Sequence, residues 1–147
     1  MPIIGGGAAS GAGITELSYV ELTAQVNIAS STEATPTLVV AAAALTFDGG
    51  TKACIEFFAP GATASSTGVL FLSLWDGATN LGQWGVVVPA GSGTVPVLLR
   101  RFLTPSNGSH TYKVQGYMSA GAGANVVAGT GGAGAKTAGY IRVTSGS

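Results

Sequence analysis

The segment Gly68-Val69-Leu70-Phe71-Leu72-Ser73-Leu74-Trp75-Asp76 decides the fold that this sequence predicts. Its apolar run is short and ends at the turn signal Asp76-Gly77, which is typical of a single β-strand. Alternate side chains of a strand point to opposite faces, so the three leucines share one face, and Phe71 and Trp75 share the other. Because both faces are apolar, we expect this strand to be covered twice, by its own core and by another copy of the chain.

The composition describes a folded chain with an unusually uncharged surface. Only 8% of the 147 residues are charged, 46% are hydrophobic, 24 are glycine and the formal net charge is zero. Disordered chains combine low hydrophobicity with high net charge, so we expect one folded domain. A neutral surface is poorly suited to a free monomer, and it favours a subunit whose surface is occupied by partners.

Several partner classes are disfavoured by the distribution of charge and hydrophobicity. The six basic residues are scattered except for Arg100-Arg101, so we expect no binding of nucleic acid. No apolar run reaches the roughly 18 residues of a membrane helix, and we expect no membrane span. Residues 1–5 lack the features of a signal peptide, so we expect no export. Cys54 is the single cysteine, which excludes an intrachain disulfide.

The order of elements predicts an antiparallel β-sandwich of the jelly-roll type. Residues 1–13 are rich in glycine and alanine, and we interpret them as a flexible arm, with one domain over 14–147. About eight to ten short strands and no amphipathic helix are expected in that domain, which is typical of a jelly roll. The long tracts 60–67 and 119–139 are expected to be loops, and 105–108 a turn. The predicted strands are 20–28, 35–45, 52–59, 68–76, 81–88, 95–103, 110–118 and 140–144.

Candidate chemical groups are few, and each has a simpler structural interpretation. The tract 129–137 resembles a phosphate-binding loop, but Ala135 intrudes before Lys136 and a strand follows where a helix is needed. His110 is the single histidine and is expected at a strand end, while Cys54 is expected to be a buried small hydrophobe. Asp48 and Asp76 precede glycine and are interpreted as turn residues. We therefore expect no catalytic site, no metal and no cofactor.

Arg100 and Arg101 cannot both face water if one face of their strand is core. One of them must reach a sheet margin, an acid such as Glu56, or a subunit boundary. We favour the subunit boundary.

Seven short segments are similar to segments of small β-rich proteins that tailed bacteriophages encode. They are ELTAQV (21–26), FDGGT (47–51), IEFFAP (55–60), LWDG (74–77), LLRRFLTP (98–105), SHTY (109–112) and GYIRV (139–143). The resemblance covers roughly residues 14 to 144 and includes no catalytic signature. It implies a fold similar to the jelly-roll domains of the tumour-necrosis-factor and C1q type, which form trimers.

The resemblance also implies a function. We expect a non-enzymatic virion structural protein that is assembled in the host cytoplasm as a homotrimer. It would be a capsid decoration, a head-fibre subunit or a tail component, with major capsid or tail proteins as further partners. The alternative is a module at a fibre tip that binds a receptor or a host surface glycan through aromatic side chains. The predicted oligomer interface consists of Leu70, Leu72, Leu74, Arg100, Arg101, Tyr140 and Arg142.

Overall fold

A computed structural model describes residues 13–89, 93–121 and 123–146 of this chain, and none of these residues is helical. The predicted arm, residues 1–13, lies outside the described residues except for Gly13. All strand pairs are antiparallel. The strands are β1 (Thr15–Leu22), β2 (Val26–Ile28), β3 (Thr37–Ala41), β4 (Leu45–Asp48), β5 (Ala53–Thr63), β6 (Leu70–Asp76), β7 (Thr79–Val87), β8 (Val95–Leu103), β9 (Asn107–His110), β10 (Tyr112–Met118), β11 (Ala124–Val127) and β12 (Gly139–Ser145).

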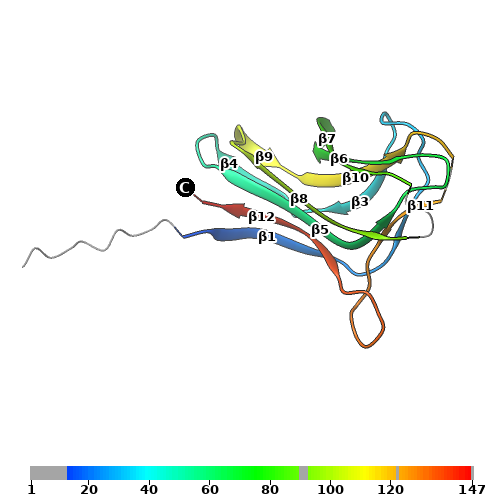
Figure 1. Cartoon of the computed structure of the whole chain (residues 1–147). Helices are drawn as coiled ribbons and strands as arrows, with labels where there is room; N and C mark the ends of the chain where they lie inside the picture. Colours follow the sequence, from blue (N-terminus) through cyan, green and yellow to red (C-terminus); the bar gives the residue numbers. More distant parts are fainter. Residues whose placement is uncertain (1–12, 90–92, 122, 147) are drawn as a thin grey trace, which may run out of the picture.

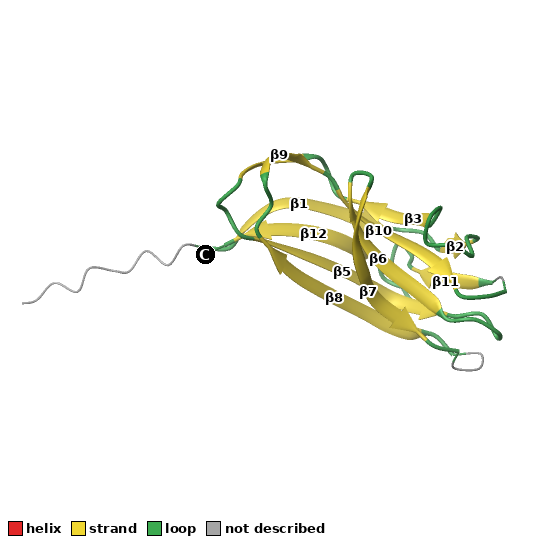
Figure 2. Ribbon diagram, turned by 90° about the horizontal axis from the view of Figure 1, so that it is seen from above, coloured by secondary structure: helices red, strands yellow, loops and turns green. Residues whose placement is uncertain are grey.

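Two sheets pack face to face, as Figure 1 shows, and form the predicted β-sandwich. One sheet has the order β1-β12-β5-β8, and the far half of β5 also pairs with β11, which pairs with β2. The other sheet has the order β3-β10-β6-β7. Apart from the β6–β7 hairpin, the chain passes between the two sheets from one of these eight strands to the next, which is a jelly-roll arrangement. The short pair β4-β9 lies at one end of the sandwich (Figure 2).

The core lies between the inner faces of the two sheets. Leu70, Leu72 and Leu74 of β6 are 0% exposed and belong to one cluster with Ile55 and Phe57 of β5. The prediction that these leucines form an oligomer interface is therefore wrong. The chain buries the leucine face of β6 within itself, and the Phe71 and Trp75 face points outward.

Several strands were predicted with the right position and facing. β12 inserts between β1 and β5, as expected for a last strand that pairs within a sheet formed by earlier segments. Pro36 immediately precedes β3, which is an edge strand of its sheet. Proline has no backbone N–H to donate, and this is tolerated at the start of an edge strand, as predicted. In β10, Tyr112, Val114 and Met118 are buried on one face, as predicted.

Four local predictions were wrong for identifiable reasons. The alternating run 20–28 is divided into β1 and β2, which pair with different strands. β5 continues through Pro60 to Thr63, with an irregularity in its pairing to β8 after Ala59. Asn107 and Gly108, the second half of the predicted turn 105–108, belong to β9 instead, because they pair with β4. The tract 119–139 contains β11, whose Ala124 and Val126 are buried in the core.

Candidate functional site

The most distinctive surface is the side of β1-β12-β5-β8 that points away from the core, which we call the outer face. The pairing register aligns its residues in three rows across the four strands. Neighbours in such rows have Cβ atoms about 5 Å apart and contact one another. From β1 to β8 the rows are Glu21-Tyr140-Phe58-Leu98, Tyr19-Arg142-Glu56-Arg100 and Glu16-Thr144-Cys54-Phe102.

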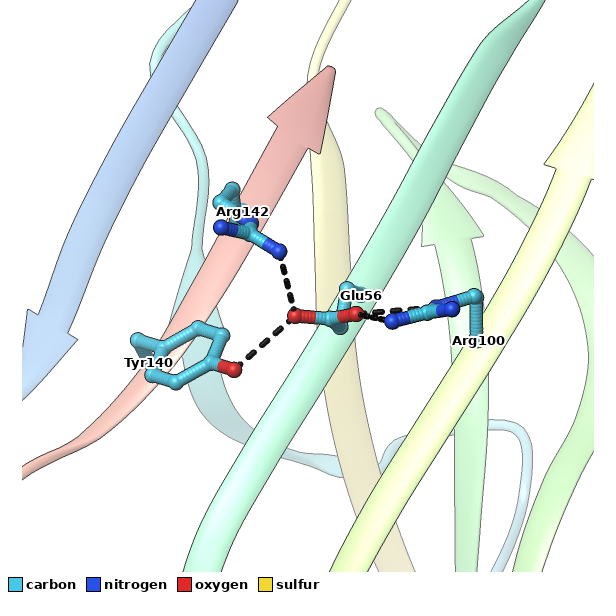
Figure 3. Close-up of polar contacts among 4 residues, drawn as sticks. All are labelled: Glu56, Arg100, Tyr140 and Arg142. Atoms are coloured by element: carbon cyan, nitrogen blue, oxygen red, sulfur yellow. Dashed lines mark hydrogen bonds and ion pairs between the residues drawn. The ribbon is translucent and has the colours of Figure 1, made fainter. Parts of the chain in front are cut away.

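A buried carboxylate lies at the centre of the outer face. Glu56 is 3% exposed, although it points away from the sandwich core. Its Oε2 accepts hydrogen bonds from Nε of Arg100, at 2.8 Å, and from Nη2 of the same residue. Its Oε1 accepts from the Tyr140 hydroxyl and from Nη2 of Arg142, each at 2.9 Å (Figure 3). The register explains this arrangement, since Glu56 is paired with Arg142 on one side and Arg100 on the other.

The electrostatics of this cluster favour the ionised carboxylate. Burial tends to raise the pKa of Glu56, but the hydrogen bonds from Arg100 and Tyr140 and the arginine charges outweigh burial, and the pKa is lowered overall. Burial and the hydrogen bond to Glu56 raise the pKa of Tyr140, so its hydroxyl stays protonated and donates. Two arginines with one glutamate leave the cluster with a net positive charge.

The structure brings together three of the seven predicted interface residues: Arg100, Tyr140 and Arg142. Arg101 lies on the opposite side of β8 and donates from Nη1 to the Leu81 carbonyl at 2.8 Å. Arg100 thus contacts an acid and Arg101 contacts a sheet margin, which are two of the three environments predicted for this pair. Glu56 was predicted only as an acid that one arginine could reach, and its position as the sole acid in an apolar strand was the available signal.

Large apolar side chains surround the Glu56 cluster. Leu98 is 61% exposed, Phe102 is 72% exposed and Tyr19 is 45% exposed. Tyr140 continues this surface, with ring centroids 5.3 Å from Tyr19 and 5.7 Å from Phe58. Exposed apolar side chains around a buried carboxylate that is paired with arginines are characteristic of a surface that binds another protein.

A hollow of about 500 Å³ opens on the outer face beside the cluster. Its lining includes Lys52, Arg100 and Arg142, together with the apolar side chains of Ile14 and Phe102. Cys54 also lines it, but burial raises the pKa of this thiol, which disfavours the reactive thiolate. The hollow therefore offers cationic and apolar contacts rather than a nucleophile.

His110 forms the second polar cluster, at the end of the sandwich where β4 and β9 pair. Its Nδ1 lies 2.5 Å from Asp76 Oδ2, and its Nε2 lies 3.0 Å from the Ser106 carbonyl and 3.4 Å from the Ser106 hydroxyl. A carboxylate and a carbonyl only accept, so both ring nitrogens donate and the imidazolium is favoured. A ring in this state has no lone pair with which to activate a serine, so the arrangement holds the loop rather than forming a catalytic triad.

The tract 129–137 connects β11 to β12 as a loop. Gly129 N donates to Thr137 O and Gly131 N donates to Lys136 O, which folds the tract back on itself. A strand follows it, so the geometry of a phosphate-binding loop, with its helix, is not formed. Within residues 13–89, 93–121 and 123–146, no group of three metal-binding side chains gathers.

Aromatic side chains, which the glycan-binding alternative requires, are dispersed over the fold. Tyr112 is buried in the core, and Trp84 packs against the core. Phe71 and Tyr117 stack with centroids 5.0 Å apart, on the outward side of the four-stranded sheet. Trp75 lies on the same side of β6 as Phe71. The rings of Phe71, Tyr117 and Trp75 are all half-buried.

Comparison of this sequence with protein-family models and with curated proteins finds no match. Among the described residues, no helix is long and apolar enough to cross a membrane.

Proposed function

We propose that this chain is a non-enzymatic structural subunit of a bacteriophage virion that associates with copies of itself as a homotrimer. The observation that carries the proposal is the outer face, where Leu98, Phe102 and Tyr19 expose apolar area around the buried carboxylate of Glu56 and its arginine partners. A single copy leaves this apolar area in water. Association would bury it, and burial contributes about 25 cal/mol of favourable free energy for each Å² of apolar surface. The interface expected for a stable contact buries about 800 Å² on each partner.

The virion assignment rests on the resemblance of seven segments to bacteriophage structural proteins, and it is supported by the kind of fold. A rigid sandwich with a scarcity of charge suits a part whose task is to be packed among partners. The partners would be further copies of the chain and the major capsid or tail proteins. The location would be the virion, as a capsid decoration, head fibre or tail component.

The solution mass tests self-association. Light scattering over a dilution series should give the mass of three chains for the wild type. Phe102→Glu places a charge on a side chain that is 72% exposed, so it should leave the fold intact and lower the mass. The matched control is Leu38→Glu, on the other sheet, where an apolar side chain is 50% exposed. A mass of one chain at all concentrations would refute the proposal of a trimer.

Labelling tests the virion assignment separately. An antibody against this chain should decorate purified particles of the virus that encodes it, at regular positions on the head or tail. Particles that carry no copy of the chain would overturn the assignment, whatever its mass in solution.

A second candidate function is binding of a host surface glycan at a fibre tip. It is favoured by the Phe71–Tyr117 stack and Trp75 on one sheet face, with the polar Gln115 between them in register with Ser73. Sugar rings pack on aromatic faces, and amides bind their hydroxyls. Retention on a glycan array that Trp75→Ala abolishes, with unchanged thermal unfolding, would support this function. Absence of retention for the wild type would contradict it.

A further inference from the structure

The outer face is divided by charge. Its β1 margin carries Glu16 and Glu21, which form no ion pair within the described residues and contribute a charge of −2. The hollow contains three cations, Lys52, Arg100 and Arg142, and one acid, Glu56, so three minus one gives +2. The margin and the hollow thus carry equal and opposite charge.

The hollow has hydrogen-bond donors left over. Arg142 donates one Nη2 hydrogen bond to Glu56, and its Nε is buried with no hydrogen-bond partner within the described part of the chain. Arg100 uses Nε and Nη2 on Glu56, which leaves its Nη1 group. A guanidinium has five N–H donors, and a buried donor without an acceptor is unfavourable. The hollow is therefore suited to a carboxylate or another oxyanion.

The β1 margin presents an acid and an apolar residue together. The pairing of β1 with β12 shifts between Glu16 and Ser18, so Leu17 is the extra residue of a bulge. Both Glu16 and Leu17 are exposed. This pair matches the hollow, where arginine donors lie beside the apolar side chains of Ile14 and Phe102.

Within one copy the acid cannot reach the arginine of β8. Three strand spacings separate β1 from β8, which is on the order of 14 Å. A contact between Glu16 and Arg100 therefore requires a second copy of the chain.

We infer that Glu16 and Leu17 on the β1 margin of one copy dock into the hollow beside Lys52, Arg100 and Arg142 of the next copy, so that each cationic hollow is completed by its neighbour's acid. This inference rests on the proposed self-association and specifies its contact. Glu16 and Leu17 lie at the β1 edge of the hollow, whereas Lys52 and Arg100 belong to its β5–β8 side. Each copy can therefore offer its β1 edge to one neighbour and the β5–β8 side of its hollow to another. Such a head-to-tail contact generates a closed ring when the rotation between copies closes.

The experiment exchanges one charge on each side of the contact. Glu16→Lys, Lys52→Glu and the double variant that carries both substitutions are compared with wild type by sedimentation over a dilution series. Neither residue takes part in the Glu56 cluster, and thermal unfolding verifies the fold. Glu16→Gln removes the acid without adding a like charge, and Glu33→Lys is the control for an exposed acid elsewhere.

We expect Glu16→Lys and Lys52→Glu each to raise the dissociation constant at least about tenfold, and Glu16→Gln to raise it less. The double variant should recover most of the wild-type affinity, because the two exchanged charges are again opposite in sign and attract each other across the contact.

Three other outcomes overturn the inference in distinguishable ways. If the wild type associates and Glu16→Lys and Glu16→Gln dissociate no more readily than wild type, this docking is wrong, but the proposed self-association stands. If, in addition, inorganic phosphate binds the wild type with an affinity that Lys52→Glu reduces, the hollow takes a free oxyanion instead. If the wild type is a single chain at all concentrations, both the docking and the proposed trimer are wrong.

Discussion

Nδ1 of His110 lies 2.5 Å from Oδ2 of Asp76, and this contact joins the end of β9 to the end of β6. Oδ1 of the same carboxylate accepts from the Thr111 amide at 3.0 Å, so Asp76 also holds the chain between β9 and β10. The side chain that was predicted to be a simple turn residue therefore links the end of β6 to the end of β9 and to the residue that connects β9 with β10. The imidazole of His110 packs beside Phe47 and Tyr112, whose ring centroids lie 5.7 Å and 6.1 Å from its own.

The first prediction is that this pair makes stability fall as the pH rises. The hydrogen bond to Asp76 raises the pKa of His110, while partial burial acts in the opposite direction. A raised folded-state pKa means that the stabilisation is complete below the unfolded value, about 6.5, and is lost as the pH rises through the folded value. Urea unfolding at pH values of about 5.5 and 9 should show the loss for wild type and a smaller one for His110→Gln. The same loss in both proteins would contradict this assignment.

The second prediction concerns Glu56 and has the opposite pH dependence. Its pKa is lowered from 4.5, so its contribution is present above about pH 4.5 and is lost as the pH falls through the folded-state value. Glu56→Gln keeps one acceptor oxygen but removes the negative charge and replaces the other oxygen with an amide donor, so the two arginines lose their counter-charge. The free energy of unfolding should fall by up to about 3 kcal/mol, since both arginines remain partly solvated. Denaturant unfolding at neutral and acidic pH measures both effects.

The matched control for that variant is Glu33→Gln, because Glu33 is exposed and bonds only the Asn80 amide among the described residues. It should change the free energy of unfolding by less than about 0.5 kcal/mol. An equal cost for the two substitutions would show that the Glu56 cluster adds nothing to stability.

The third prediction tests which face of β6 is core. Leu72 is 0% exposed, and Leu72→Ala should destabilise the chain by about 2–5 kcal/mol. Leu38→Ala, at a side chain that is 50% exposed, should cost much less. If Leu72→Ala lowered the mass in solution without lowering the melting temperature, the leucines would belong to an interface after all.

The class of fold could be predicted from the sequence because the signal was local. Strands such as β8 and β12 could be located as short segments rich in apolar residues that follow glycine-rich turns or tracts. The choice between the two apolar faces of β6 could not be predicted, because it depends on which face meets Ile55 and Phe57 from a distant strand. β11 was missed for a different reason: its four residues, Ala-Asn-Val-Val, lie within a tract rich in glycine and alanine, and only their pairing with β2 and β5 marks them as a strand.

The candidate site was predictable only in part. Two adjacent arginines in a strand must point to opposite faces, and Glu56 could be named as an acid that one of them reaches. The convergence of Tyr140 and Arg142 on that carboxylate required the register between β5 and β12, which only the fold supplies. The exposed apolar residues around the cluster were equally hidden, since Leu98 and Phe102 belong to a strand whose other face is core.

The fourth prediction is that Gly68→Ala destabilises the chain through a backbone clash. A Cβ at Gly68 would overlap the carbonyl oxygen of Ala120, at the point where Val69 and Ser119 hydrogen bond to each other. The clash is between backbone atoms, which cannot move away as a flexible side chain would. The free energy of unfolding should therefore fall by about 1–3 kcal/mol. Gly13→Ala is the matched control, because a Cβ there meets nothing within 4 Å. Thermal unfolding of both variants measures the difference, and equal melting temperatures would mean that the β6 start and residues 119–120 are not held in this close approach.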